Sequence, residues 1–253
     1  KIVIITGANT GLGFANAVDY ASRGGKIYVA CRDKKRGEDA VKEIIKQSGS
    51  EKVHFQPLDL ASLDSIREFV KKFKTLEKKL DILVNNAGIY GCLKSFTKDG
   101  FEMQMGVNHL GHFLLTNLLL DMLKKSDQGR IVVVSSIAES WGAIERDNFM
   151  SEKSYDKHKA YCNSKLANML YTRELAKKLA KTNVTVNCCH PGAVMTEIGR
   201  HGKKILWYCF VFLFFPLFKT PMEGAQTQIR RGIDPVLKKV SGKYFSDFEI
   251  PVV

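Results

Sequence analysis

Two side chains four residues apart in the sequence could move a proton to or from a substrate. Tyr161 and Lys165 carry a phenol and an ammonium, and a spacing of four residues places both on one face of a helix. A free phenol has a pKa of about 10, and a neighbouring positive charge lowers that pKa and makes the phenol a better acid–base group. Such pairs are also common on solvent-facing helices, so this pair indicates a catalytic role only if other features of the chain do so too.

A glycine-rich turn near the start of the chain is suited to binding a pyrophosphate. The sequence T-G-A-N-T-G-L-G at 6–13 follows the apolar run 2–5 and leads into a helix-like stretch at 14–22. Glycines allow backbone N–H groups and a helix N-terminus to face a phosphate with no side chain in the way. The strand before the turn and the helix after it favour a dinucleotide-binding turn over an ordinary one. The residues that we expect to contact the cofactor here are Gly7, Asn9, Thr10, Gly11, Leu12 and Gly13.

The elements that must position these residues alternate along the chain. Short β-branched runs lie at 2–6, 27–31, 52–56, 81–84, 131–135 and 184–189, and segments of helical period lie between them. In 62–79 the apolar residues follow a helical spacing, and Ser62 can cap its start. This alternation predicts a parallel sheet with helices on both faces. With no repeat and no linker, the sequence predicts one doubly wound, Rossmann-type α/β domain over 1–253.

Charge and cysteine content narrow the classes of partner. The formal net charge of +13 favours something acidic, so nucleic acid, anionic lipid and a phosphorylated cofactor are all candidates. The lysine-rich stretches at 34–36 and 71–74 fall where helices are expected, which indicates a solvated or membrane-facing surface, and we expect no nucleic-acid partner. The six cysteines form no C-x-x-C pair, so we expect neither a zinc site nor a disulfide framework, and no metal.

Taken together, the motifs resemble those of the short-chain dehydrogenases/reductases. The turn matches the family's T-G-x-x-x-G-x-G, 85–88 matches N-N-A-G, and 161–165 matches Y-x-x-x-K. The long separation between Ser136 and Tyr161 predicts an extra loop at about 140–155. The resemblance implies a nicotinamide-dependent oxidoreductase with a catalytic tetrad of Asn108, Ser136, Tyr161 and Lys165.

The resemblance also implies further cofactor-binding residues beyond the first turn. Asp59 and Leu60 match the region that contacts adenine, and 191–192 with Thr196 match the region near the nicotinamide carboxamide. For His190, His109 and His112 we expect turn-forming, core or interface roles rather than catalysis. The remaining residues implied to lie beside the cofactor are Asn86, Ala87, Gly88, Pro191, Gly192, Tyr161 and Lys165.

The end of the second predicted strand decides between the two nicotinamide dinucleotides. An acidic side chain there accepts a hydrogen bond from the ribose 2′-hydroxyl, whereas a cation offsets a 2′-phosphate. Arg32 holds this position, and its planar guanidinium suits a phosphate, with Lys34 and Lys35 nearby. We therefore expect NADP (NADPH), with NAD less favoured, although Asp33 would face the ribose if the turn were shifted by one residue.

The implied chemistry is the reduction of a carbonyl or its reverse. Hydride arrival builds negative charge on the carbonyl oxygen, which must be stabilised and protonated. The resemblance implies that Tyr161 gives the proton and Ser136 donates a hydrogen bond to the oxygen. It further implies that Lys165 lowers the pKa of Tyr161 and holds the ribose hydroxyls, and that Asn108 positions a water in the proton relay.

Several stretches are similar to the retinol dehydrogenase branch of the family, at 30–33, 108–113, 160–168, 219–221, 224–227 and 242–247. This branch implies an NADP-dependent enzyme for retinol/retinal or another lipophilic alcohol and its aldehyde or ketone. It also implies a membrane location, with the endoplasmic reticulum and a cytosol-facing domain expected and a mitochondrial membrane as the alternative. Two other functions stay open: a steroid or lipid-aldehyde reductase, and a non-catalytic NADP(H)-binding sensor or scaffold at a membrane. A homodimer is also open. A complete tetrad favours the enzyme.

One segment interrupts the α/β alternation. Residues 193–219 look like a substrate-loop insertion at the mouth of the site, and 205–218 are fourteen residues without a charge, flanked by lysines. As a helix this run would span about 21 Å, which is less than the ~30 Å of a bilayer's hydrocarbon core. One interpretation of this run is a buried core helix. The aromatic residues on all sides of the run favour a second one, a lid that enters the membrane interface. A lipophilic substrate could then reach the site from the membrane.

Overall fold

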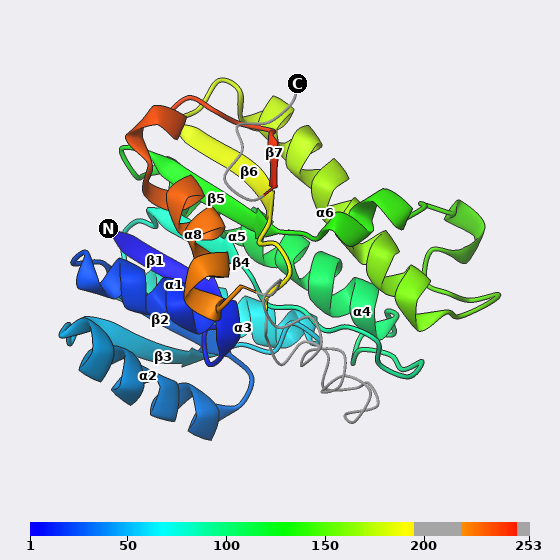
Figure 1. Cartoon of the computed structure of the whole chain (residues 1–253), viewed down its shortest axis with the longest axis horizontal. Helices are drawn as coiled ribbons and strands as arrows, with labels where there is room; N and C mark the ends of the chain where they lie inside the picture. The colour runs from blue at the N-terminus through cyan, green and yellow to red at the C-terminus, as the bar shows by residue number, and fades with distance from the viewer. Residues whose placement is uncertain (195–218, 247–253) are drawn as a thin grey trace.

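Seven parallel strands form one sheet in the computed structural model, which describes residues 1–194 and 219–246 (Figure 1). Their order across the sheet is β3-β2-β1-β4-β5-β6-β7, and every neighbouring pair is parallel. The bounds are β1 Ile2–Thr6, β2 Lys26–Cys31, β3 Val53–Pro57, β4 Ile82–Asn85, β5 Gly129–Val134, β6 Val184–His190 and β7 Tyr244–Ser246. This confirms the predicted parallel sheet of a doubly wound, Rossmann-type α/β fold.

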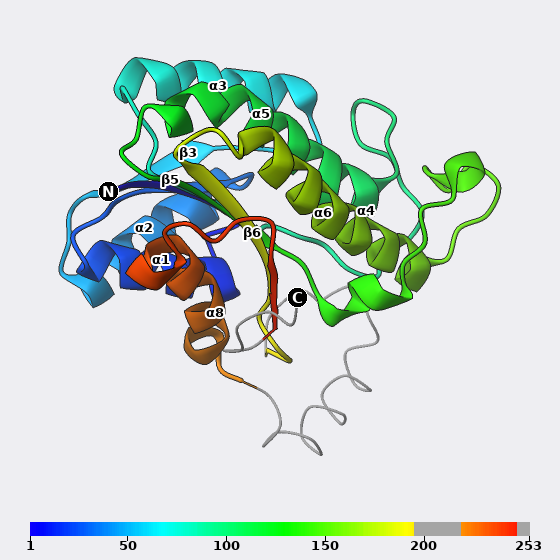
Figure 2. The same ribbon diagram turned by 90° about the horizontal axis from the view of Figure 1, so that it is seen from above.

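Helices cover both faces of the sheet (Figure 2). Helices α1, α2 and α8 lie on one face, and α3, α5 and α6 lie on the other. A short helix, α4, and a π-helical turn at Gly106–Leu110 precede α5. The bounds are α1 Gly11–Ser22, α2 Lys34–Ser48, α3 Leu63–Leu76, α4 Met103–Met105, α5 Gly111–Lys124, α6 Lys157–Leu179 and α8 Pro221–Ile233.

Two hydrophobic cores result from the alternation of side chains along each strand. Ile4 of β1 joins the core beneath α3, α5 and α6, whereas Val3 and Ile5 join the core beneath α1, α2 and α8. Because both faces are buried, the strands read as continuous apolar runs rather than as alternating ones. Ser62 caps α3 by accepting a hydrogen bond from the Ser65 N–H, as its position in the sequence predicts.

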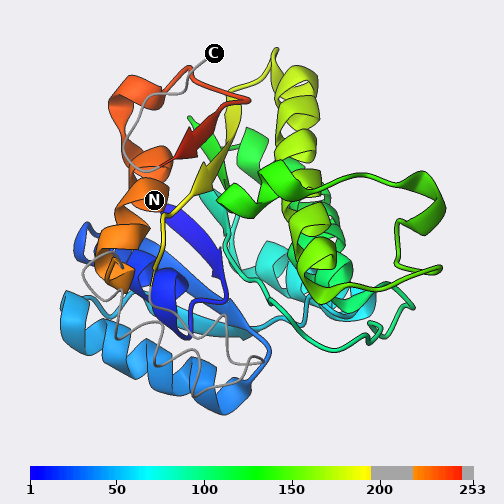
Figure 3. The same cartoon turned by 45° about the vertical axis from the view of Figure 1, so that its right-hand side comes forward.

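The connection between β5 and α6 contains the extra loop that the sequence predicts. It holds two short 3₁₀ helices, Ile137–Trp141 and Arg146–Asn148, and it projects from the body of the domain (Figure 3). The last strand, β7, was not predicted: it has only three residues, and it pairs with the end of β6. This strand forms because its backbone pairs with the edge strand β6, and its own sequence carries no strand pattern.

The predicted insertion leaves and rejoins the described part of the fold at one place. Val194 forms a bridge with Lys219, and the Lys219 N–H donates to the Ala193 carbonyl at 2.8 Å. A Cβ atom added to Gly224 of α8 would lie 2.4 Å from Val194 and 2.9 Å from Leu12, so the end at Val194 lies beside α8, close to the start of α1. Thr196 and the apolar run 205–218 lie outside the described residues. No helix within 1–194 and 219–246 is long and apolar enough to cross a membrane.

Candidate active site

The predicted site residues gather at the carboxyl ends of the parallel strands. The glycine-rich turn follows β1, Asn86–Gly88 follow β4, Ser136 follows β5, and Pro191 and Gly192 follow β6. In the sheet β1 and β4 are neighbours, and the chain order reverses between them. Ligands of doubly wound sheets bind at such a reversal, so the predicted residues share the position where a cofactor is expected.

The glycine-rich turn packs tightly against the turn that follows β4. A Cβ atom on Gly13 would lie 2.6 Å from both the Asn86 side-chain nitrogen and the Gly7 carbonyl oxygen. A Cβ atom on Gly7 would meet Ala87 at 3.1 Å, and Gly7 has a φ of 66°, which favours glycine. The Asn86 side chain also donates to the Thr6 carbonyl at 2.8 Å. The two turns therefore form one rigid unit that only glycine allows.

The N-terminus of α1 is suited to an anionic group. Helices α2, α3, α6 and α8 each have a side-chain cap, whereas Thr10 at the start of α1 makes no side-chain cap hydrogen bond. The first turn of α1 carries no acidic residue, and Gly11 has a φ of 57°. The first N–H groups of a helix lack partners within the helix and attract anions. Together with the glycine packing, this geometry fits the pyrophosphate of a dinucleotide.

Thr6 joins the two turns to the interior. Its hydroxyl oxygen accepts from the Asn86 and Ala87 N–H groups, both at 2.9 Å, and lies 2.8 Å from Nε2 of His112. His112 is 3% exposed, and burial lowers its pKa to about 3, so the ring is neutral. His112 was expected to be a core or interface residue, and the structure places it in the core beneath the site.

The groups that would face the adenosine lie at the ends of β2 and β3. Arg32 directly follows β2 and is exposed. Asp33 is the N-cap of α2, and its Oδ1 accepts from the Arg36 N–H at 2.9 Å. Asp59 lies after β3, where its Oδ1 accepts from the Ala61 N–H at 3.0 Å, and the adjacent Leu60 is buried. One carboxylate oxygen of Asp33 is thus engaged by its own helix.

Tyr161 lies near the start of α6 and is 9% exposed. Burial raises the pKa of Tyr161 to about 12, a hydrogen bond with Ser136 acts in the opposite direction, and Tyr90 and Cys162 raise it further. The sequence predicts that Lys165 lowers the pKa of Tyr161. In the structure of the protein alone, burial has the larger effect and raises that pKa. Tyr161 is therefore protonated at neutral pH, which suits a proton donor.

Lys165 lies one turn beyond Tyr161 on the same face of α6. Its Nζ is 5.5 Å from the centroid of the Tyr161 ring and donates to the Val134 carbonyl at 2.9 Å. Burial lowers the pKa of Lys165 to about 8, so the ammonium form still prevails at pH 7. A Cβ atom on Gly88 would lie 3.6 Å from this Nζ, so the turn after β4 also borders it.

Ser136 lies at the end of β5 and is half-buried. Its Oγ accepts from the Ala138 N–H at 3.2 Å and interacts with Tyr161. The preceding Ser135 is buried, and its hydroxyl donates to the Lys165 carbonyl at 2.9 Å. Ser135 therefore holds α6 against β5, whereas Ser136 faces Tyr161, as the family pattern implies for the second serine.

Asn108 holds the parts of the site together through its side chain. It lies fully buried in the π-helical turn, a feature that is frequent at functional sites. Its Oδ1 accepts from the Ile89 N–H at 2.8 Å, and its Nδ2 donates to the Ile89 carbonyl at 3.0 Å and to Ser164 Oγ at 2.9 Å. Its carbonyl lies 3.1 Å from both His112 Nδ1 and Asn168 Nδ2. Asn108 thus links the turn after β4, α5 and α6.

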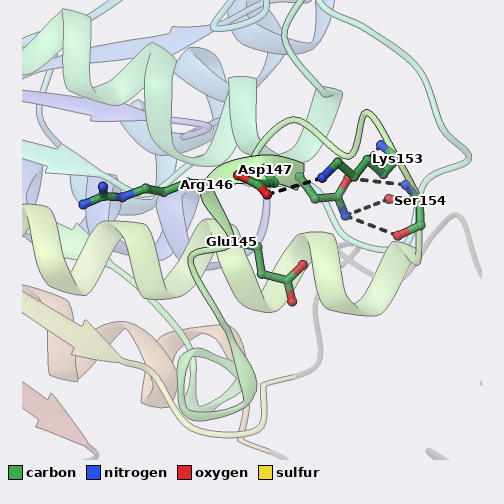
Figure 4. Close-up of a pocket in the computed structure, with 6 residues that line it drawn as sticks. Glu145, Arg146, Asp147, Lys153 and Ser154 are labelled. Atoms are coloured by element: carbon green, nitrogen blue, oxygen red, sulfur yellow. Dashed lines mark hydrogen bonds and ion pairs between the residues drawn. The ribbon is translucent and has the colours of Figure 1, made fainter.

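A surface pocket lies away from these groups. It measures about 440 Å³ and lies in the loop between β5 and α6 (Figure 4). None of the predicted catalytic or cofactor-binding residues lines it, and the side chains that do are Glu145, Arg146, Asp147, Asn148, Lys153 and Ser154. Two of these residues, Lys153 and Asp147, form an ion pair at 3.4 Å. We assign no part of the chemistry to it.

Comparison with known proteins agrees with the fold and the motifs. A family model described as short chain dehydrogenase matches residues 1–204. Retinol dehydrogenase 12 of Homo sapiens is 50% identical over 249 residues, which cover 98% of this chain and 78% of that protein. Retinol dehydrogenase 11 of Homo sapiens is 48% identical over 250 residues, which cover 99% of this chain and 78% of that protein.

The chain belongs to the short-chain dehydrogenase family, in its retinol dehydrogenase-like branch. It is an oxidoreductase of the alcohol/aldehyde type, and the family uses a nicotinamide cofactor. A solved protein from Mycobacterium paratuberculosis is similar to it, with a TM-score of 0.76 and 32% identity over 100% of this chain and 85% of that one. Pseudomonas aeruginosa RhlG, solved with NADP, has a TM-score of 0.77 and 25% identity over 97% of this chain and 94% of that one.

Proposed function

We propose that this chain is an NADP-dependent oxidoreductase that interconverts a lipophilic alcohol and its aldehyde or ketone, with retinol/retinal as the foremost substrate. The observation that carries the proposal is the convergence of Tyr161, Ser136 and Lys165 beside the turn after β4. The names of the similar relatives support the choice of retinoid.

The proposed cofactor site uses the glycine-rich turn for the pyrophosphate and Arg32 for the 2′-phosphate of NADP. The engagement of the Asp33 carboxylate as the cap of α2 supports Arg32 over Asp33 as the ribose-facing group. Asp59 and Leu60 would border the adenine, Asn86–Gly88 the middle of the cofactor, and Pro191, Gly192 and Thr196 the carboxamide. Lys165, with its remaining ammonium protons, would hold the nicotinamide ribose.

In the proposed mechanism, the reduced nicotinamide supplies a hydride when bound. Tyr161, protonated at neutral pH, donates its proton to the carbonyl oxygen, and Ser136 donates a hydrogen bond to that oxygen. The nearby Lys165 ammonium favours the phenolate that remains. Asn108 keeps α6 and the turn after β4 in register, because its side chain bonds to both.

We further propose that the enzyme works at a membrane surface, in the endoplasmic reticulum or, as the alternative, at a mitochondrial membrane. The charge of +13 and the apolar run 205–218 in the sequence support an anionic lipid surface. Replacing Phe210, Phe212 and Phe214 together with Ser should lower binding to liposomes and raise the apparent KM for retinal. The KM for a small soluble aldehyde should stay unchanged.

The test of the function is a substrate panel measured with NADPH and with NADH. All-trans-retinal, medium-chain aldehydes and ketosteroids are each offered to the purified protein. Fast turnover of retinal with NADPH supports the proposal. Faster turnover of a ketosteroid or a medium-chain aldehyde would identify that compound, rather than retinal, as the substrate. Tight NADPH binding without turnover of any compound would instead indicate a sensor or scaffold.

A further inference from the structure

A second tyrosine lies against Tyr161, and the sequence motifs do not include it. The rings of Tyr90 and Tyr161 meet edge to face, with centroids 4.8 Å apart and an interplanar angle of 75°. This separation and angle lie in the preferred range for aromatic pairs. Tyr90 is half-buried, whereas Tyr161 is 9% exposed, so Tyr90 covers one side of the Tyr161 ring and keeps part of its own surface open.

The backbone on either side of Tyr90 is fixed by two buried amides. Asn108 forms two hydrogen bonds with the backbone of Ile89, at 2.8 and 3.0 Å. Gln104 accepts from the Gly91 N–H at 3.0 Å, and both amide side chains are 0% exposed. Gly91 has a φ of 69°, so the chain turns directly after Tyr90. Tyr90 is thus the one residue between two pinned neighbours, and its ring is presented to Tyr161.

The hydroxyl group of Tyr90 has its own partner on α6. It lies 2.6 Å from Nδ1 of His158, three residues before Tyr161 on the same helix. The rings of Tyr90 and His158 are also in contact, with centroids 5.5 Å apart. His158 is exposed, so this hydrogen bond lies at the outer border of the pair of tyrosines. Helix α6 therefore contacts Tyr90 in two places, through the Tyr161 ring and through the His158 side chain.

We propose that Tyr90, held by His158, is a positioning residue for Tyr161 and forms an aromatic wall of the substrate site. The ring fixes the tilt of the phenol and keeps water from one of its faces. Its open surface contacts the apolar part of the substrate next to the reacting carbon. This inference rests on the proposed function, because it takes Tyr161 as the proton donor.

The ring of Tyr90 and its hydroxyl group make separate contributions, and two variants separate them. Tyr90→Ala removes the contact with Tyr161, and we expect kcat for retinal to fall about three- to tenfold, as the size of such ring contacts indicates. Tyr90→Phe keeps the ring, and we expect it to restore at least half of kcat. His158→Ala removes the hydrogen bond that Tyr90→Phe also removes, and in addition the ring contact with Tyr90. The double variant Tyr90→Phe/His158→Ala should therefore be no slower than His158→Ala alone.

The pH profile distinguishes positioning from a general loss of structure. Four groups act on Tyr161: Ser136, Lys165, Cys162 and Tyr90 itself. Alcohol oxidation needs the Tyr161 phenolate, and removing the Tyr90 ring lets water reach Tyr161 and lowers its pKa. We therefore expect the pH profile of kcat for oxidation to move to lower pH in Tyr90→Ala. It should move less in Tyr90→Phe, which removes only the effect of the Tyr90 phenol group and keeps the ring.

The decisive experiment compares kcat, its pH profile and the Kd for NADPH in the wild type, the three single variants and Tyr161→Phe. The inference predicts a lower kcat and a shifted profile for Tyr90→Ala, with a Kd within twofold of the wild type. An unchanged kcat and profile in a folded Tyr90→Ala protein would overturn the inference while leaving the proposed function intact. Retained turnover in Tyr161→Phe would instead overturn the proposed function.

Discussion

The Thr6 hydroxyl and Nε2 of His112 lie 2.8 Å apart in the protein interior. The other ring nitrogen of His112, Nδ1, lies 3.1 Å from the Asn108 carbonyl, which can only accept. In the neutral ring Nδ1 therefore carries the proton, and Nε2 accepts from Thr6. This ring connects the nucleotide turn, through Thr6, with the π-helical turn that holds Asn108.

Replacing either end of this contact should weaken both folding and cofactor binding. In His112→Leu the Thr6 hydroxyl loses its acceptor at 2.8 Å and keeps only the longer contact with the Val84 carbonyl at 3.4 Å. We therefore expect a loss of about 1 kcal/mol, the net contribution of a typical hydrogen bond. Thr6→Val should cost more, because it also removes the acceptor of the Ala87 N–H and one of the two acceptors of the Asn86 N–H. In urea unfolding, the double variant should lose less stability than the sum of the two single variants. Additive losses would show that the two residues do not act as a unit.

Lys165 should make stability depend on pH in a defined direction. Burial lowers its pKa from 10.5 to about 8 in the folded protein, so between these values the unfolded chain binds more protons. Stability should therefore gain a contribution that rises with pH across this window. Burial raises the pKa of Cys188 and Cys189, which acts in the opposite direction above pH 9. The comparison is therefore with Lys165→Met, which keeps both thiols.

The measurement is urea unfolding of the wild type and Lys165→Met at pH 7.5 and pH 9. The difference in unfolding free energy, wild type minus variant, should increase from the lower to the higher pH. A difference that stays constant or decreases would mean that Lys165 is not held in a setting that disfavours its charge.

Arg32→Ala should weaken the binding of NADPH far more than that of NADH. Arg32 is exposed at the end of β2, and only NADPH carries the 2′-phosphate that its guanidinium would bind. We expect a loss of about 1.5–3 kcal/mol, as for hydrogen bonds to charged groups, and thus a Kd for NADPH that is at least tenfold higher. Lys42→Ala, which removes an exposed cation farther along α2, is the matched control. Equal weakening of both cofactors would favour Asp33 as the ribose-facing residue.

The fold was readable from the sequence because its elements are defined locally. The predicted strands 2–6, 27–31 and 131–135 lie within two residues of β1, β2 and β5 at each end, since β-branched runs between turns define them. Strand β7 and the π-helical turn at Gly106–Leu110 depend on packing between distant segments, and the sequence pattern does not show them.

The site was predictable only where it follows motifs. Asp33 stands directly before a predicted helix, so its role as a cap was available from the N-cap preference for Asp. Tyr90 and His158 are 68 residues apart and meet only in the fold, so no spacing rule connects them. The raised pKa of Tyr161 likewise depends on burial, which the Y-x-x-x-K spacing does not reveal.

The central claim is that Tyr161 donates the proton in carbonyl reduction, and Tyr161→Phe tests it most directly. The variant removes one hydroxyl group and keeps the ring that packs against Tyr90. We expect retinal reduction with NADPH to fall by far more than tenfold, while the Kd for NADPH stays within about threefold of the wild type. Retention of more than about a tenth of wild-type turnover, a barrier change below ~1.4 kcal/mol, would contradict the account.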